Sequence, residues 1–554
     1  MRLTLIGVAS KYVHQCLAPW CLKAGLDQYG VYEPCQVLEL NINQPFHQAL
    51  SSIMKTTPDL IGFSTYIWNI QYIRNLIDSI KLLSPNTVIV LGGPEAGSRP
   101  DGILTEIAKA DFVISGPGEY AFSELVRRLS QRLDVKDIPG LSLRSNGEVI
   151  MNRPMPLPLE QPSPYTKECI DALHGRIVYL ETSRGCPYRC SFCLSGLESS
   201  VTFIPLEQAK QQLLLLAKSG AKTIKLVDRT FNCHKERAYE IIRFLIEKHL
   251  DGTIGNVCFH FEIAADLFDE ATLQLLKHAP TGLFQMEAGL QSFHAKTLEA
   301  CQRKTDIDKL SKNIAFLISG GNVHLHLDLI AGLPYEDFDT FGKSVDQALA
   351  LAPHMLQLGF LKLLHGSRLR DQAQEFGILS TPFPPYEILT TKWLSFEDIQ
   401  KLKQCEEALD RLYNSGKFNR TMNLVFQSSI SPFHFFCIMG EILCKIQGSL
   451  SLDQCAKLAF DFIKTLPGIS MPALRDAMVM DRIATDNTGY IPPFLAITDT
   501  RLGSAVNGLR QIYPPGKKLG ACILYEGGER LFWTDYANRH PVTQEYAVYS
   551  KPLV

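Results

Sequence analysis

The sequence predicts an α/β protein with two successive parallel sheets, followed by a mainly helical α+β region. Residues 1 to about 150 alternate short apolar runs with amphipathic helical stretches, which is typical of a doubly wound parallel sheet. Six more strand-then-helix repeats lie between Arg176 and about His365. Helical periodicity then continues until two apolar runs flank Gly527-Gly528, a pattern that indicates a β-hairpin.

These changes of pattern divide the chain into four expected segments. Five prolines between Met151 and Thr166 restrict φ and remove backbone donors, so an extended linker is expected there. The segments are a first domain (1–150), a linker (151–173), a barrel domain (174–366) and a C-terminal helical domain ending in a β-hairpin (367–554).

Composition limits the classes of partner. A formal net charge of −2 argues against non-specific nucleic-acid binding, and no apolar run is long enough to span a membrane. Fifteen cysteines without framework spacing suit a reducing compartment. We therefore expect a cytoplasmic protein that acts on a small molecule and has no nucleic-acid or membrane partner.

Small residues follow the expected strands of the first sheet. Those strands are Leu3–Val8, Val37–Leu40, Leu60–Ser64, Val88–Leu91 and Phe112–Ile114. Parallel strands end at a common edge, where ligands of such sheets bind. The residues expected there are Ser64, Thr65, Gly92, Gly93, Gly116 and Glu119. Ordinary glycine turns would explain any single position, but together they favour a flat platform for a cofactor.

The motif Cys186–Cys193 has C-x3-C-x2-C spacing directly after the first strand of the second repeat. Closely spaced thiolates suit an iron–sulfur cluster. A closed structural zinc site needs four donors, whereas three cysteines leave one iron of a cluster open. Aromatic Phe192 inside the motif could cover an adenine. A zinc site and a chance spacing remain as alternatives.

Later strands of the second repeat carry polar side chains. Period-two alternation places His324, His326 and Asp328 on one face of a strand. Buried parallel strands are normally continuous apolar runs, so this face predicts a ligand-filled interior or, alternatively, a self-satisfied polar network. Asp228, after the second strand, either accepts a hydrogen bond from a ligand or caps a helix.

The cysteine spacing, with an aromatic residue before the last cysteine, resembles the signature of the radical S-adenosylmethionine (SAM) superfamily. Glu287–Ser292 and Gly332–Glu336 resemble its SAM-proximal segments, and residues 1–150 resemble the cobalamin-binding domain of one subfamily. The resemblance implies a Rossmann-like first domain and a (βα)6 partial TIM barrel.

The same resemblance implies three cofactors: a [4Fe–4S] cluster, SAM and cobalamin. By this resemblance the cluster is expected to be bound by Cys186, Cys190 and Cys193. SAM is expected to be bound by Phe192, Asp228, Glu287, Gln291 and Gly332. Cobalamin is expected to be bound by the six strand-end residues of the first sheet. His326 and Asp328 are expected to join the cluster cysteines as catalytic residues.

The loop after the first strand lacks the Asp-x-His-x-x-Gly motif of cobalamin mutases. His14 in that loop is therefore expected to make a loop or interdomain contact rather than to bind cobalt.

The implied activity is that of a cobalamin-dependent radical SAM enzyme. Such an enzyme cleaves SAM reductively to a 5′-deoxyadenosyl radical, with electrons from reduced flavodoxin or ferredoxin. Methyl transfer to an unactivated carbon is the expected outcome, as in class B methyltransferases. Rearrangement or cyclisation, a methylthiotransferase-like reaction and a non-catalytic iron–sulfur regulator remain as alternatives.

Overall fold

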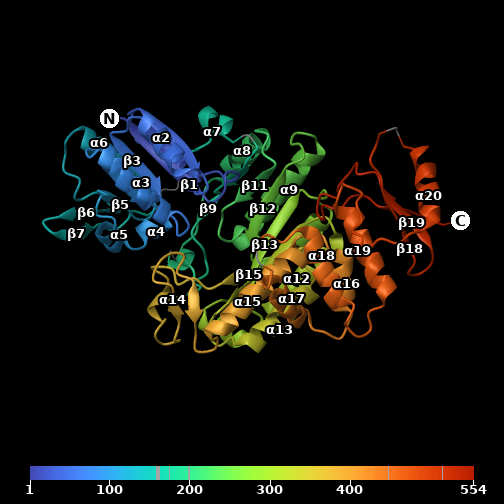
Figure 1. The fold of residues 1–554 in the computed structure, drawn as a ribbon. Helices are drawn as coiled ribbons and strands as arrows, with labels where there is room; N and C mark the ends of the chain where they lie inside the picture. The colour runs from blue at the N-terminus through green and yellow to red at the C-terminus, as the bar shows by residue number, and fades with distance from the viewer. Residues whose placement is uncertain (157–161, 174, 198–199, 447, 514–515, 554) are drawn as a thin grey trace. The chain divides into compact units, whose positions relative to one another are not determined.

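The computed structural model describes residues 1–156, 162–173, 175–197, 200–446, 448–513 and 516–553. They fall into two compact units (Figure 1). The first unit comprises Met1–Leu267 with two later segments, Cys301–Lys304 and Lys362–Ile388. The second comprises Phe268–Ala300, Thr305–Leu361 and Leu389–Val554.

The first unit begins with a seven-stranded sheet in the order β2-β1-β3-β4-β5-β6-β7. Its strands are β1 (Leu3–Ala9), β2 (Cys35–Asn41), β3 (Leu60–Ser64), β4 (Val88–Gly92), β5 (Phe112–Ile114), β6 (Leu141–Ser145) and β7 (Glu148–Met151). The five predicted parallel strands are confirmed. The antiparallel strands β6 and β7 were not predicted, and Met151, expected in the linker, ends β7.

Helices cover both faces of this sheet (Figure 1). They are α1 (Leu17–Gln28), α2 (Phe46–Lys55), α3 (Ile70–Leu83), α4 (Pro94–Gly97), α5 (Pro100–Glu106) and α6 (Gly118–Ser130). Ile6 packs into a core with α2 and α3, while its neighbour Leu5 packs into a second core with α1 and α6. Because adjacent strand residues point to opposite faces, a strand covered on both sides must be apolar throughout. The doubly wound prediction is confirmed.

Six further strands form a parallel sheet in the order β15-β14-β13-β12-β11-β8. They are β8 (Ile177–Leu180), β11 (Thr223–Leu226), β12 (Cys258–Ile263), β13 (Phe284–Gln291), β14 (His324–Ala331) and β15 (Met355–Phe360). The helices between them are α8 (Leu206–Ala217), α9 (Lys235–Leu250), α10 (Glu270–Lys277), α11 (Ala295–Ala300), α12 (Ile307–Gly320) and α13 (Phe338–Ala350). Neighbouring strands follow chain order, as in a βα barrel, so the predicted (βα)6 partial barrel is confirmed.

Short elements complete this region. They are α7 (Lys167–Asp171), β9 (Ser183–Arg184), β10 (Thr202–Phe203), α14 (Arg368–Asp371), β16 (Leu379–Ser380), β17 (Ile388–Thr390) and the 3-10 turns Leu194–Leu197, Phe231–Cys233 and Ala265–Leu267. Antiparallel β9 and β10 form a small ribbon, with β9 before the cysteine motif in the sequence and β10 after it.

The C-terminal region is mainly helical, as predicted. Its elements are α15 (Phe396–Leu409), a π-helical turn (Asp410–Asn414), α16 (Asn419–Phe426), α17 (Pro432–Cys444), α18 (Leu452–Ile463), α19 (Met471–Thr485), α20 (Thr500–Arg510), β18 (Gly520–Leu524), β19 (Arg530–Thr534) and β20 (Tyr549–Pro552). The predicted hairpin is β18–β19, and β20 adds a third antiparallel strand that was not predicted. In the described part of the chain, no helix combines the length and apolar character needed to cross a membrane.

Candidate functional site: a cofactor cavity and a cysteine loop

A cavity of about 740 Å³ lies at the carboxyl ends of β1, β3, β4 and β5. This is the switch point of the first sheet, because β1 is flanked by β2 on one side and β3 on the other. Five of the six predicted strand-end residues line it, namely Ser64, Gly92, Gly93, Gly116 and Glu119. Tyr179, Arg229 and Glu262 also line it, so residues of β8, β12 and the turn after β11 share one cavity with the first sheet.

Thr65, the sixth strand-end residue, is buried beside the cavity and supports its glycine turn. Its hydroxyl donates to the Gly92 carbonyl at 2.7 Å and accepts from the Ala96 amide at 3.0 Å. Gly93 has φ +94°, and a Cβ there would lie 2.6 Å from the Thr65 carbonyl oxygen. Gly93 is therefore required by the backbone, whereas a Cβ at Gly92 would make only an ordinary contact of 3.6 Å.

A buried asparagine holds the ends of β1 and β3 at this edge. The Asn69 side-chain amide donates to the carbonyls of Val8 and Ser64 at 3.0 and 3.1 Å, and its oxygen accepts from the Tyr66 amide. The Tyr66 ring stacks on Trp68 with centroids 4.3 Å apart, and both side chains line the cavity. The cavity edge is thus fixed by side-chain bonds to backbone groups.

The loop after β1 pairs with the edge of β8. The Ile177 amide donates to Val13 and its carbonyl accepts from the Gln15 amide. Nδ1 of His14 lies 2.8 Å from the Tyr179 hydroxyl, so His14 makes the interdomain contact expected of it. Burial and nearby cations lower the pKa of His14.

Arg184 joins the cysteine motif to the cavity. This β9 residue contacts both Glu119 carboxylate oxygens, at 2.6 and 3.2 Å, and donates to Glu181 at 2.5 Å. Burial alone would raise the pKa of Glu119, but the Arg184 guanidinium outweighs it and the pKa lies below its ordinary value. Glu119, predicted to bind cofactor, thus also holds the start of the cysteine loop against α6.

Asp228 shapes the entry to that loop. Its buried carboxylate accepts from the amides of Thr182 and Ser183, at 2.6 and 3.0 Å, and from the Thr182 hydroxyl. Burial raises the pKa of Asp228, and these donors oppose the rise. These hydrogen bonds fix the backbone that precedes Gly185 instead of capping a helix. The predicted ligand contact of Asp228 stays a prediction.

Cys186 and Cys190 are buried and Cys193 is half-buried, on one loop after β9 that also carries half-buried Phe192. The Cys186 sulfur lies 3.6 Å from the Thr230 hydroxyl, and the Cys190 sulfur accepts from the Arg303 guanidinium at 3.8 Å. Among the described residues, no three His, Cys, Asp or Glu side chains are grouped to hold a single metal ion. Three thiols supplied by one largely buried loop are the donor set that a cluster takes.

The later segments of the first unit anchor this loop. The Ser191 amide donates to Cys301 at 2.9 Å, and its carbonyl accepts from the Leu369 amide at 2.8 Å. The loop conformation therefore depends on chain more than a hundred residues further on.

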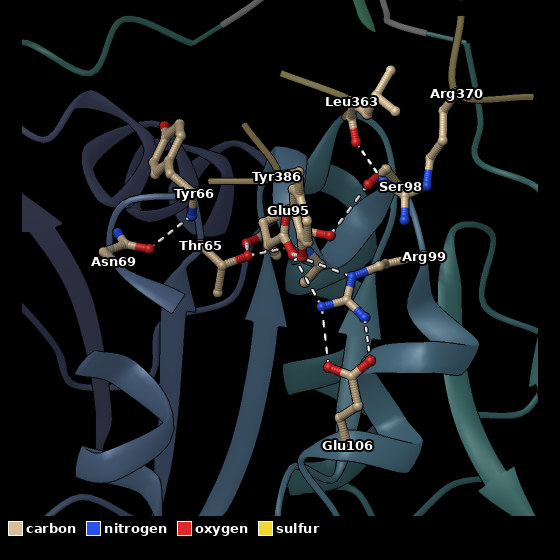
Figure 2. A network of polar contacts seen from close by, with 12 residues as sticks. Thr65, Tyr66, Asn69, Glu95, Ser98, Arg99, Glu106, Leu363, Arg370 and Tyr386 are labelled. Carbon is tan, nitrogen blue, oxygen red and sulfur yellow. Dashed lines mark hydrogen bonds and ion pairs between the residues drawn. The ribbon is translucent and has the colours of Figure 1, made fainter. Parts of the chain in front are cut away.

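Segment Lys362–Ile388 also reaches the first sheet (Figure 2). The buried Tyr386 hydroxyl donates to Glu95 at 2.5 Å, and Arg99 contacts both Glu95 and Glu106 at 3.1 Å. The Glu95 amide in turn donates to the Thr65 carbonyl. This chain of contacts supports the glycine turn, and no local sequence pattern indicates it.

In the second unit, β14 carries the predicted polar face. His324, His326 and Asp328 are half-buried, alternating with fully buried leucines. Glu287 and Gly289 pair in register with His326 and Asp328, and Gln285 contacts His326 at 2.9 Å. His324 also stacks on His354. The polar face of β14 is present as predicted, and His324 and His326 on it already contact neighbouring side chains.

The ends of β13 and β14 are joined by a buried carboxyl. Gln291 and Gly332 have positive φ values of +75° and +93° there. Oε1 of Glu336 accepts from the hydroxyls of Ser292 and Ser344 at 2.7 and 2.8 Å. Burial raises the pKa of Glu336 to about 7.

Comparison with known proteins shows that segments of the chain match known families. Residues 3–126 match the B12 binding domain, and residues 180–348 match the radical SAM superfamily. This chain carries both domains. Residues 374–508 match a third family, described as a protein of unknown function, DUF4080.

Two relatives found by sequence are named as methyltransferases. The chain is 28% identical over 348 residues to the cobalamin-dependent radical SAM methyltransferase TokK of Streptomyces tokunonensis, covering 59% of this chain and 50% of TokK. It is 28% identical over 316 residues to the 2-(S-pantetheinyl)-carbapenam-3-carboxylate methyltransferase of Streptantibioticus cattleyicolor, covering 54% and 46%. The chain therefore spans about half the length of these curated relatives.

The fold is shared with the cobalamin-dependent SAM radical enzyme OxsB. The TM-score is 0.61 at 15% identity, covering 86% of this chain and 78% of OxsB. The radical SAM domain implies a [4Fe–4S] cluster and SAM, and the B12 binding domain implies cobalamin. The three-thiol loop and the cavity at the switch point fit these groups.

Substitutions at the two glycines should separate backbone support from ligand contact. Gly93→Ala should lower the stability of the B12 binding domain by about 2 kcal/mol, because positive φ and the Thr65 carbonyl both oppose a Cβ. Gly92→Ala should keep the melting temperature yet weaken hydroxocobalamin binding, followed by absorbance. Gly503→Ala, in open space on α20, is the control and should affect neither. Equal loss of stability in both cavity variants would contradict this assignment.

Glu336 should make stability fall as pH rises. Its folded pKa of about 7 exceeds the ordinary 4.5, so the folded state keeps a proton that the unfolded state loses between those values. The free energy of unfolding should drop by about 3 kcal/mol across this window and then level off. Glu336→Gln should remove that slope in urea titrations at a series of pH values, whereas exposed Glu236→Gln should not. If the free energy of unfolding of Glu336→Gln falls with pH as it does in the wild type, the Glu336 carboxyl is not the cause of that fall.

Proposed function

We propose that this chain is a cobalamin-dependent radical SAM enzyme that transfers a methyl group to an unactivated carbon of a small molecule. The observation that carries the proposal is the cavity shared by the switch-point edge of the B12 binding domain and by Tyr179, Arg229 and Glu262 of the radical SAM domain. A corrinoid held on the first sheet would lie beside the strands that carry the cysteine loop. The two methyltransferase relatives support the same reaction class.

Each group of residues has a proposed task. Cys186, Cys190 and Cys193 would hold the cluster, and SAM would be bound by Phe192, Asp228, Glu287, Gln291 and Gly332. Ser64, Gly92, Gly93, Gly116 and Glu119 would contact cobalamin, with Thr65 supporting the glycines. When bound, the reduced cluster supplies reductive cleavage of SAM and cobalamin supplies a methyl group. The protein's own contribution is to orient these groups and to exclude water.

The remaining parts of the proposal follow from this role. The protein would work in the reducing cytoplasm and take electrons from reduced flavodoxin or ferredoxin. Residues 1–150 would be the cobalamin domain, 151–173 the linker, 174–366 the radical SAM barrel and 367–554 a family-specific domain.

The cluster assignment is tested first. Cys186→Ala, Cys190→Ala and Cys193→Ala together should remove the iron–sulfur absorbance and all 5′-deoxyadenosine formation in anaerobic assays with SAM and dithionite. The control Cys258→Ala removes a half-buried thiol on β12 outside the motif and should keep iron content unchanged. Retention of about four irons per chain in the triple variant would overturn the assignment. With SAM labelled in its methyl group, label found in the product of a screened substrate distinguishes methyl transfer from rearrangement or cyclisation.

His326 and Asp328 are proposed to orient the substrate. His326→Ala and Asp328→Ala should retain cluster and corrinoid, while methylated product falls further than 5′-deoxyadenosine, because a misplaced substrate wastes the radical. Each lost partner of a buried polar group costs about 1–3 kcal/mol, roughly 10- to 100-fold in yield. The control is His278→Ala, which removes an exposed side chain directly after α10. Proportional losses of both yields, with a lower melting temperature, would assign this face to packing alone.

A further inference from the structure

We propose that Arg303 tunes the cluster: its guanidinium donates to the Cys190 sulfur and raises the reduction potential of the bound centre. This inference rests on the proposed function, since it requires a cluster on the cysteine loop. Arg303 lies outside the cysteine motif, 113 residues beyond Cys190.

Two contacts place the guanidinium on the loop. Nη1 lies 3.8 Å from the Cys190 sulfur, and the guanidinium carbon lies 5.5 Å from the centre of the Tyr188 ring. Both partners belong to the motif itself. A cation above an aromatic face and beside a sulfur is held from two directions.

Neighbouring residues fix Arg303 independently of its own side chain. The Cys301 carbonyl accepts from the Ser191 amide, and Gln302, at φ +52°, accepts from the Arg368 guanidinium at 2.9 Å. Residues 301–304 are therefore tied to the cysteine loop on one side and to α14 on the other. This anchoring brings a cation to the sulfur of Cys190, a residue that is only 7% exposed.

The electrostatic consequence has a definite sign. One-electron reduction adds negative charge to a centre already bound by three thiolates, with the electron supplied by a low-potential donor and no proton transferred. A nearby cation and an N–H···S hydrogen bond stabilise the more negative state, and burial of Cys190 limits screening. Cys186 has a neutral neighbour instead, the Thr230 hydroxyl. Arg303 therefore favours the reduced form.

The test is a potentiometric titration of the anaerobically reconstituted full chain, monitored by electron paramagnetic resonance with dithionite as reductant. Arg303→Lys keeps the charge, Arg303→Gln keeps a neutral donor and Arg303→Met keeps neither. The midpoint potential should become more negative in the order wild type, Lys, Gln, Met, at equal iron content. If the Met variant loses its cluster, the difference between the Lys and Gln variants still decides the sign.

Arg368→Met is the matched control, because it removes a cation that anchors the same segment without contacting a cysteine. It should leave the midpoint potential at the wild-type value. Equal potentials across the Arg303 series, or an equal shift in Arg368→Met, would overturn the inference. A wild-type protein that takes up no iron–sulfur cluster would instead overturn the proposed function itself.

Discussion

The salt bridge between Arg184 and Glu119 is the interaction on which the site depends. Only Gly185 separates Arg184 from Cys186, and Glu119 lies in the first turn of α6 at the cavity edge of the first sheet. Both side chains are largely buried, at 23% and 9% exposure, so neither charge can be left alone without a cost of about 3–5 kcal/mol. The pair therefore ties the start of the cysteine loop to the edge of the cavity.

Several polar side chains around the site form hydrogen bonds to backbone groups. Asn69 joins the ends of β1 and β3, Thr65 holds the glycine turn, and Asp228 holds the two residues before Arg184. Strand ends leave carbonyl and amide groups without ladder partners, and buried backbone groups must find substitutes. A polar residue at a strand end can therefore support the backbone, as the contacts of Thr65 and Asp228 show.

Local patterns in the sequence were enough to predict the two parallel sheets, the cysteine loop and the polar face of β14. Apolar runs, period-two alternation and motif spacing are all properties of neighbouring residues. The pairs Arg184–Glu119, Arg303–Cys190 and Tyr386–Glu95 are separated by 65, 113 and 291 residues and carry no such signal. Strands β6 and β7 are joined by Asn146-Gly147, a hairpin signal that the sequence does contain, and they were missed because βα alternation alone was followed in this region. Strand β20 was missed because residues 535–548 separate it from β19, so no short hairpin turn marks the pair.

The buried carboxyls of Glu119 and Glu336 differ in pKa because their hydrogen-bond donors differ. Glu119 faces a guanidinium, which keeps its pKa below the ordinary value, whereas Glu336 meets only hydroxyl donors and its pKa rises to about 7. Arg184 also contacts Glu181, so one cation offsets two carboxylates beside the cavity. Glu262, another acidic residue of the cavity wall, lies 3.6 Å from Lys225. Pairing of this kind leaves much of the cavity wall to backbone groups, glycines and aromatic rings. Such a surface suits a large macrocycle bound through shape and hydrogen bonds, which is how a corrin ring with an amide periphery would be held.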